Sequence, residues 1–225
     1  MDQDPRIAPS RTWEELRDEV QSRADRQVYP LTDMLAEDIR EIQSNISSMD
    51  RDEWGRAWSA MGQRYADKGK GLEGSDPKAA ADAYVMAWRY FAFGAWPTQN
   101  SPEKKKAFDQ CIEAFHAYTR LQSPTMEIVR IPFEGTEIPV YLQLPEGVRP
   151  APVIITIGGL DSYKEYTAER YGPVYMAQDI GFVAIDSPGT GESPVRADVD
   201  SERIYSAVID YLLTRDDVDP TRIAA

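Results

Sequence analysis

The chain has 225 residues and a formal net charge of −13, and apolar residues make up 42% of it. This balance is that of a soluble globular protein with room for one large domain or two small ones. The acidic excess argues against a nucleic-acid or anionic-membrane surface, which needs clustered lysine and arginine. No apolar run is long enough to cross a membrane, and the amino terminus lacks the basic and apolar regions of a secretory signal.

Cys111 and His116 are the only cysteine and the only histidine. A single cysteine excludes an internal disulfide and fits a reducing cytosol, so we expect a cytoplasmic protein. Because potential ligands are so few, and because no dinucleotide fingerprint or phosphate-binding loop occurs, we expect no metal and no cofactor. On a helix the two residues would lie about 140° apart around the axis, which disfavours a Cys–His nucleophile pair. We therefore interpret His116 as a surface or partly buried helix residue.

Residues 1–123 have the pattern of helices throughout. Thr12-Trp13-Glu14-Glu15 forms a capping box, in which the hydroxyl and the carboxylate bond the free amides of the first turn reciprocally. Asp50 is a second candidate cap, followed by apolar residues at three- and four-residue spacing. Ser75-Asp76-Pro77 and Ser101-Pro102 place proline in the first turn, where its missing N–H has no cost. The sequence therefore predicts an all-helical first region.

The last two helices of this region should be antiparallel neighbours, because the connection Gly94–Asn100 is short. The run Lys104–Lys106 is interpreted as a solvated helix face. The aromatic side chains of the region are expected mainly in the helix–helix core, and a subset is a candidate lining for an aromatic substrate's pocket. That aromatic set comprises Trp54, Trp58, Tyr84, Trp88, Phe91 and Trp96.

From residue 124 on, the period changes from that of helices to that of strands. Met126–Ile131 and Ile138–Leu144 alternate, with a hairpin turn between them. Pro152–Ile157 is a continuous β-branched run of the kind buried in a parallel sheet. The pattern then alternates between helix and strand, with a helix at Ala168–Gln178, a strand at Phe182–Asp186, a helix at Ser201–Leu213 and a strand beginning at Arg222. The prediction is an α/β fold whose sheet, in residues 124–225, is mostly parallel and doubly wound.

The predicted sheet is incomplete within these residues. A central parallel strand needs a neighbour on each side and helices on both faces, and an open apolar edge is an aggregation liability. We therefore expect the chain to be the N-terminal portion, or a truncated product, of something longer.

Two glycine-containing loops follow successive predicted strands. Asp186–Ser193 reads Asp-Ser-Pro-Gly-Thr-Gly-Glu-Ser, and Gly158–Ser162 reads Gly-Gly-Leu-Asp-Ser. Open α/β folds bind ligands at the carboxyl ends of their strands. Adjacent glycines leave the backbone free to direct N–H groups into a cavity, as an oxyanion hole requires. Asp186 is interpreted as a strand-end residue that holds the turn after it.

The order of these elements resembles the first half of an α/β-hydrolase. The segment Gly158–Glu165 (Gly-Gly-Leu-Asp-Ser-Tyr-Lys-Glu) is similar to the 2,6-dihydroxypseudooxynicotine hydrolase group. That group is related to FrsA-like esterases and to fungal hydrolases that shorten polyketide chains. The resemblance spans roughly Trp54 to Ala225. It implies serine-dependent cleavage of an ester or a ketone-adjacent C–C bond in a small aromatic or polyketide-like substrate, with the helical region as a cap and dimer surface.

The resemblance also implies roles for particular residues. Gly158, Gly159, Leu160 and Asp161 correspond to the oxyanion and substrate pocket, and Asp161 to an auxiliary acidic catalytic residue. A carboxylate there would orient a substrate hydroxyl or water, whereas the alternative is an aspartate that only caps its turn. The family's nucleophile lies in a Gly-x-Ser-x-Gly elbow after the strand that begins at Ile223. No serine of the chain has that pattern, and the triad acid and histidine would follow later, so we expect the chain to be inactive alone.

The expected partner is a small-molecule substrate, with neither nucleic acid nor membrane, and the resemblance favours a homodimer through the helical region. Two other hypotheses remain open. One is a non-catalytic truncated product that acts as a helical interaction domain. The other is an enzyme completed by a second chain that supplies the nucleophile elbow.

Overall fold

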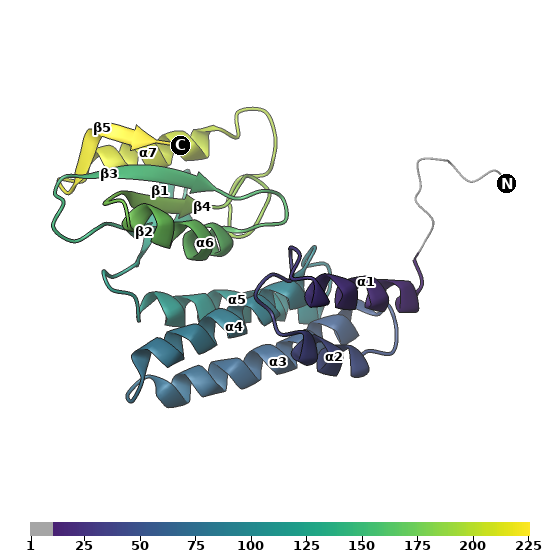
Figure 1. Cartoon of the computed structure of the whole chain (residues 1–225). Helices are drawn as coiled ribbons and strands as arrows, with labels where there is room; N and C mark the ends of the chain where they lie inside the picture. Colours follow the sequence, from purple (N-terminus) through teal and green to yellow (C-terminus); the bar gives the residue numbers. More distant parts are fainter. Residues whose placement is uncertain (1–10) are drawn as a thin grey trace. The chain divides into compact units, whose positions relative to one another are not determined.

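The computed structural model describes residues 11–225. They divide into two compact units (Figure 1), of which the first ends at Phe115 and the second begins at His116. The first unit is helical, and its last helix continues into the second. No helix in the described part of the chain is long and apolar enough to cross a membrane. The helices are α1 (Trp13–Asp25), α2 (Ala36–Ser44), α3 (Arg51–Leu72), α4 (Pro77–Ala95) and α5 (Pro102–Thr119).

The predicted helix starts are confirmed. Thr12 and Glu15 form the capping box of α1, each side chain accepting the other residue's backbone N–H. The Asp50 carboxylate accepts the Glu53 N–H at the start of α3. Asp76 caps α4 in the same way, with proline in the first turn. Short polar side chains thus satisfy N–H groups that have no partner within the helix.

Helices α3 and α4 pack closely because α3 carries glycine at every seventh position. A Cβ atom at Gly62 would lie 2.7 Å from the Phe91 ring, and one at Gly69 would lie 3.1 Å from the Tyr84 ring. The α4 rings therefore rest directly on the α3 backbone. At Gly55, the glycine instead makes room for the start of α5, since a Cβ would lie 2.9 Å from the Glu103 backbone.

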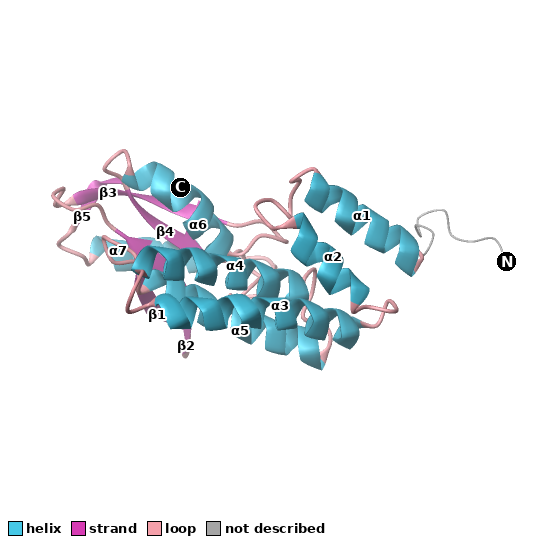
Figure 2. Cartoon of the chain, turned by 60° about the horizontal axis from the view of Figure 1, so that its bottom comes forward, coloured by secondary structure: helices cyan, strands magenta, loops and turns pink. Residues whose placement is uncertain are grey.

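The core of the helical unit is aromatic, as expected. Trp58 is fully buried, with its ring 5.4 Å from Trp54 and 4.5 Å from Phe93. Helices α4 and α5 are antiparallel neighbours, visible side by side in Figures 1 and 2. Trp88 meets Phe115 at one end of this pair, and Gly94 meets Ala107 at the other.

Lys104 overturns the interpretation of the lysine run as a solvated face. Lys105 and Lys106 are exposed, but Lys104 is only 6% exposed. Its ammonium donates a hydrogen bond to the Trp96 carbonyl at 2.7 Å and lies 6.0 Å from the centre of the Trp54 ring. Burial lowers the pKa of Lys104 to about 8, because removal from water disfavours the charged form. The close approach of α3 to the start of α5 buries this side chain.

The second unit contains a five-stranded sheet in the order β1-β2-β4-β3-β5. Its strands pair in two ways. The β1–β2 and β2–β4 pairs are antiparallel, whereas β3 pairs in parallel with both β4 and β5. The sheet is therefore mixed rather than mostly parallel, because the β1–β2 hairpin joins it beside β4. The elements are β1 (Glu127–Phe133), β2 (Thr136–Gln143), β3 (Ala151–Ile157), α6 (Lys164–Met176), β4 (Gly181–Ile185), α7 (Arg203–Leu213) and β5 (Val218–Ala224).

The two helices of this unit cover opposite faces of the sheet. Successive side chains of a strand point to opposite faces. On β4, Phe182 packs on α6, where a Cβ at Gly172 would lie 2.5 Å from its ring. The next residue, Val183, belongs instead to the core that includes Ile204 and Val208 of α7. The doubly wound arrangement thus holds for the central strands.

The glycine spacing of α3 predicts how two matched substitutions differ. Gly62→Ala should lower the free energy of unfolding by about 1–3 kcal/mol, because the new methyl group collides with the Phe91 ring. Gly71→Ala, on the same helix, meets nothing within 4 Å and should raise it by up to about 1 kcal/mol. Urea unfolding followed by circular dichroism measures both. Equal effects at the two positions would contradict the packing described.

Candidate functional site

The two glycine-containing loops meet at one edge of the sheet. Strands β3 and β4 are parallel neighbours, with Ile157 paired to Ile185 at their carboxyl ends. Each loop begins at the next residue, Gly158 in one case and Asp186 in the other. Ligands of open α/β sheets bind at such an edge. The structure thus brings together the two segments that the sequence singled out.

Hydrogen bonds hold the first loop in a defined shape. The Gly159 N–H donates to the Ser162 hydroxyl oxygen at 2.8 Å, which closes the loop on itself. The Ser187 hydroxyl donates to the Gly158 carbonyl at 2.5 Å, which ties the first loop to the second. Gly158 has no room for a side chain, since a Cβ would collide with the Ser162 carbonyl. The glycine is therefore required by close approach within the loop.

The tip of this loop faces solvent. Leu160 is 79% exposed, and Asp161 is exposed beside it. Among residues 11–225, the Leu160 N–H has no hydrogen-bond acceptor. The tip thus presents a backbone donor and a carboxylate at the carboxyl edge of the sheet.

Behind the loop lies a buried charged cluster, which we call the lysine cluster. Lys164, the first residue of α6, is 1% exposed. Its ammonium lies 2.8 Å from a carboxylate oxygen of Glu165, 3.0 Å from one of Asp186 and 2.7 Å from one of Glu192. It also lies 5.3 Å from the centre of the Tyr141 ring. The cluster comprises Tyr141, Lys164, Glu165, Asp186 and Glu192.

Asp186 is the acceptor that joins the parts of this cluster. One of its oxygens accepts the Lys164 backbone N–H at 2.8 Å. The other accepts the Lys164 ammonium and also the Glu192 N–H, at 2.9 Å. Gly191 lies so close to this carboxylate that a Cβ there would collide with it, and its φ is +51°. Asp186 thus holds the turn that follows it, as expected, and binds the start of α6 as well.

Glu165 is the most deeply buried carboxyl of the cluster. It is fully buried, and its Oε1 accepts the Tyr141 hydroxyl at 2.9 Å. Its Oε2 has no partner among the described residues. Burial raises the pKa of Glu165, although the Lys164 charge opposes the shift. Burial alone would lower the pKa of Lys164, but the charges of Glu165, Asp186 and Glu192 raise it.

Lys164 and Glu165 stand in the motif that carries the family resemblance, but the sequence assigns them no role. Adjacent lysine and glutamate at the start of a helix usually lie on a solvated surface. Only the pairing of β3 with β4 reveals that Asp186 faces them. The signal available was a charged pair at the start of the helix that follows one strand and an aspartate directly after the next strand.

His116 lies at the edge of this unit. It is half-buried, with its ring 6.0 Å from that of Tyr141 and nearly perpendicular to it. Burial lowers the pKa of His116, and the nearby Glu192 charge partly offsets this. Among the described residues, no serine hydroxyl is bonded to His116, so it forms no nucleophile pair.

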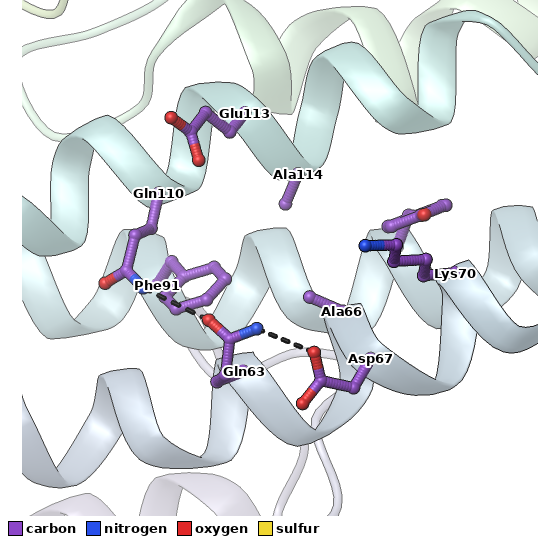
Figure 3. A pocket seen from close by; sticks show the side chains of 9 residues that line it. Gln63, Ala66, Asp67, Lys70, Phe91, Gln110, Glu113 and Ala114 are labelled. Atoms are coloured by element: carbon purple, nitrogen blue, oxygen red, sulfur yellow. Dashed lines mark hydrogen bonds between the residues drawn. The ribbon is translucent and has the colours of Figure 1, made fainter.

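The helical unit carries a separate hollow of about 220 Å³ (Figure 3). Gln110 donates to Gln63, which donates to Asp67, so these polar groups on its wall pair with one another. Its volume is below the range of about 300–1,000 Å³ usual for small-molecule sites. The rest of the lining includes Ala66, Lys70, Tyr84, Phe91, Glu113 and Ala114.

Comparison with known proteins identifies the family. The family model described as Esterase FrsA-like matches residues 40–225. The chain belongs to the FrsA-like esterase family. The chain is similar to "Alpha/beta hydrolase ucsC" of an Acremonium species, 28% identical over 202 residues, and to "2,6-dihydropseudooxynicotine hydrolase" of Paenarthrobacter nicotinovorans, 27% identical over 161 residues. The first alignment covers 79% of the chain and the second 71%.

A solved structure shares the fold of this FrsA-like chain. The crystal structure of the 2,6-dihydroxy-pseudo-oxynicotine hydrolase matches it with a TM-score of 0.70 at 22% identity, over 83% of this chain and 53% of that one. The chain spans 40% and 44% of the length of the two relatives named above. The comparisons therefore establish a family and a fold for a segment that corresponds to part of its relatives.

The raised pKa of Glu165 predicts a pH-dependent stability. An acid whose pKa is higher in the folded than in the unfolded state makes the protein less stable as pH rises above about 4.3, the pKa of an exposed glutamate. Glu165→Gln cannot ionise and keeps an acceptor for the Tyr141 hydroxyl. Its stability relative to the native chain should therefore increase from pH 5 to pH 8. Counted from well below pH 4.3, the full increase is about 1.4 kcal/mol for each tenfold weakening of the Glu165 acid on folding, and part of it is already present at pH 5.

Urea unfolding at the two pH values measures this difference. Glu146→Gln, at an exposed position, reports the effect of the amide substitution itself. If the free energy of unfolding of Glu165→Gln differs from that of the native chain by the same amount at both pH values, the raised pKa of Glu165 is contradicted.

Proposed function

We propose that this segment supplies the first oxyanion loop of a serine-dependent hydrolase. The observation that carries the proposal is the exposed tip of the Gly158–Ser162 loop, with its unpaired Leu160 N–H at the carboxyl edge of the sheet. Attack of a serine on a carbonyl places negative charge on the carbonyl oxygen. A backbone N–H at the tip, near Leu160 and Asp161, would donate a hydrogen bond to that oxygen, which lowers the barrier.

The Asp161 carboxylate has a separate role in this proposal. It orients a hydroxyl of the substrate or a water molecule close to the reacting carbonyl. The bond broken is an ester or a C–C bond beside a ketone, and the substrate is a small aromatic or polyketide-like molecule. The family membership supports hydrolysis, and the name of one relative supports an aromatic substrate.

The nucleophile in this proposal comes from outside the 225 residues. No serine of the sequence stands in a Gly-x-Ser-x-Gly pattern, and none of the described serines is bonded to His116. The catalytic serine, its acid and its histidine would belong to further residues of the protein or to a second chain.

The test uses p-nitrophenyl butyrate as substrate. The purified 225-residue chain should show no turnover above buffer, because it has no activated nucleophile. The native protein isolated from its source should hydrolyse the ester. In that protein Asp161→Ala should lower kcat/KM by about 100-fold or more, the low end of the effects of positioned acid–base groups.

Asp216→Ala, at another exposed aspartate, is the matched control and should leave kcat/KM unchanged. Turnover by the 225-residue chain that survives both Asp161→Ala and His116→Ala would contradict this account of the site.

A further inference from the structure

We infer that Lys164 is the positioning residue of the Gly158–Ser162 loop, acting through Asp186. The inference rests on the proposed function, since it assigns what holds the oxyanion loop in place. It concerns a residue that would not touch the substrate, because Lys164 is 1% exposed.

The loop is attached to the neighbouring loop at two points, one at its start and one just after its end. The attachments are made to two consecutive residues, Ser187 and Asp186. At the start, the Gly158 carbonyl accepts the Ser187 hydroxyl at 2.5 Å. After the loop, Lys164 donates its backbone N–H to one Asp186 oxygen at 2.8 Å and its ammonium to the other at 3.0 Å. A single carboxylate thus binds one residue by both its backbone and its side chain. The loop tip lies between these two attachments.

The ammonium makes the second attachment strong. Asp186 is 2% exposed, so water does not screen its interaction with Lys164. Both charges gain from additional hydrogen bonds, because Lys164 also reaches Glu165 and Glu192, and the Asp186 carboxylate accepts the Glu192 N–H. Buried ion pairs stabilise a structure only when such further bonds are present.

The test compares hydrogen exchange in folded variants of the 225-residue chain. Lys164→Met removes the ammonium but keeps the backbone N–H that binds Asp186. Because three carboxylates would then lack their cation, a second variant combines Lys164→Met with Glu165→Gln and Asp186→Asn, which leaves only Glu192 charged. Lys78→Met, at an exposed lysine paired with Asp82, is the matched control.

A positioning role predicts a local effect. In the triple variant the Gly159 N–H should exchange at least about 10-fold faster, while the core amides of Ile155 and Val183 change by less than about 3-fold. Lys164→Met alone should accelerate the core amides as well, because three buried carboxylates lose their cation. The control should leave all three unchanged. In the triple variant, equal acceleration at Gly159 and in the core, no change at Gly159, or failure to fold would overturn the inference.

The native protein from the source gives the functional measurement, again with p-nitrophenyl butyrate. The triple variant should lower kcat by about 100-fold, the effect of losing an oxyanion donor, with KM within about 3-fold. A rise in KM with kcat unchanged would overturn the positioning role. If the native protein does not hydrolyse the ester, the proposed function fails, whereas the exchange measurement still decides the role of Lys164.

Discussion

The second unit depends on one buried ammonium group and the carboxylates around it. Lys164 has carboxylate oxygens of three residues within 3.0 Å. An unpaired charge at this depth would strongly destabilise the fold, so the cluster is stable only as a whole. Because its members come from β2, α6 and the loop after β4, the cluster joins the sheet to a helix and to a turn. The candidate oxyanion loop is held at the surface of this cluster.

The sheet order makes that arrangement possible. Strand β4 lies between β2 and β3, so Tyr141 on β2 and Asp186 after β4 can reach the same side chain. Parallel pairing brings the carboxyl ends of β3 and β4 to one edge. Positions 158 and 191 require glycine. A side chain would collide with the Ser162 carbonyl at position 158 and with the Asp186 carboxylate at position 191. Close contacts of the backbone at the two glycines and the buried charges of the lysine cluster thus determine the geometry of the same candidate site.

Local signals predicted the helix starts and most of the strands, because caps such as Thr12 and Asp50 act within one turn of their helix. Long-range pairing could not be predicted in the same way. The hairpin of β1 and β2 gave no sign that it would join the sheet beside β4 and make it mixed. Lys104 and Lys164 look like surface residues by composition, and only tertiary packing buries them. The position of Asp161 in the loop after β3 was predictable, whereas its catalytic role is a proposal.

Side-chain NMR titration of the lysine ammonium groups tests directly whether the surrounding carboxylates hold Lys164 in its charged form. We expect Lys164 to keep its proton at pH 10.5, the ordinary pKa of lysine, because the surrounding carboxylates outweigh the effect of burial. Lys104, buried without such partners, should lose its proton near pH 8 in the same experiment. A Lys164 that titrates below pH 10.5 would contradict this, because the surrounding carboxylates would then not outweigh the effect of burial.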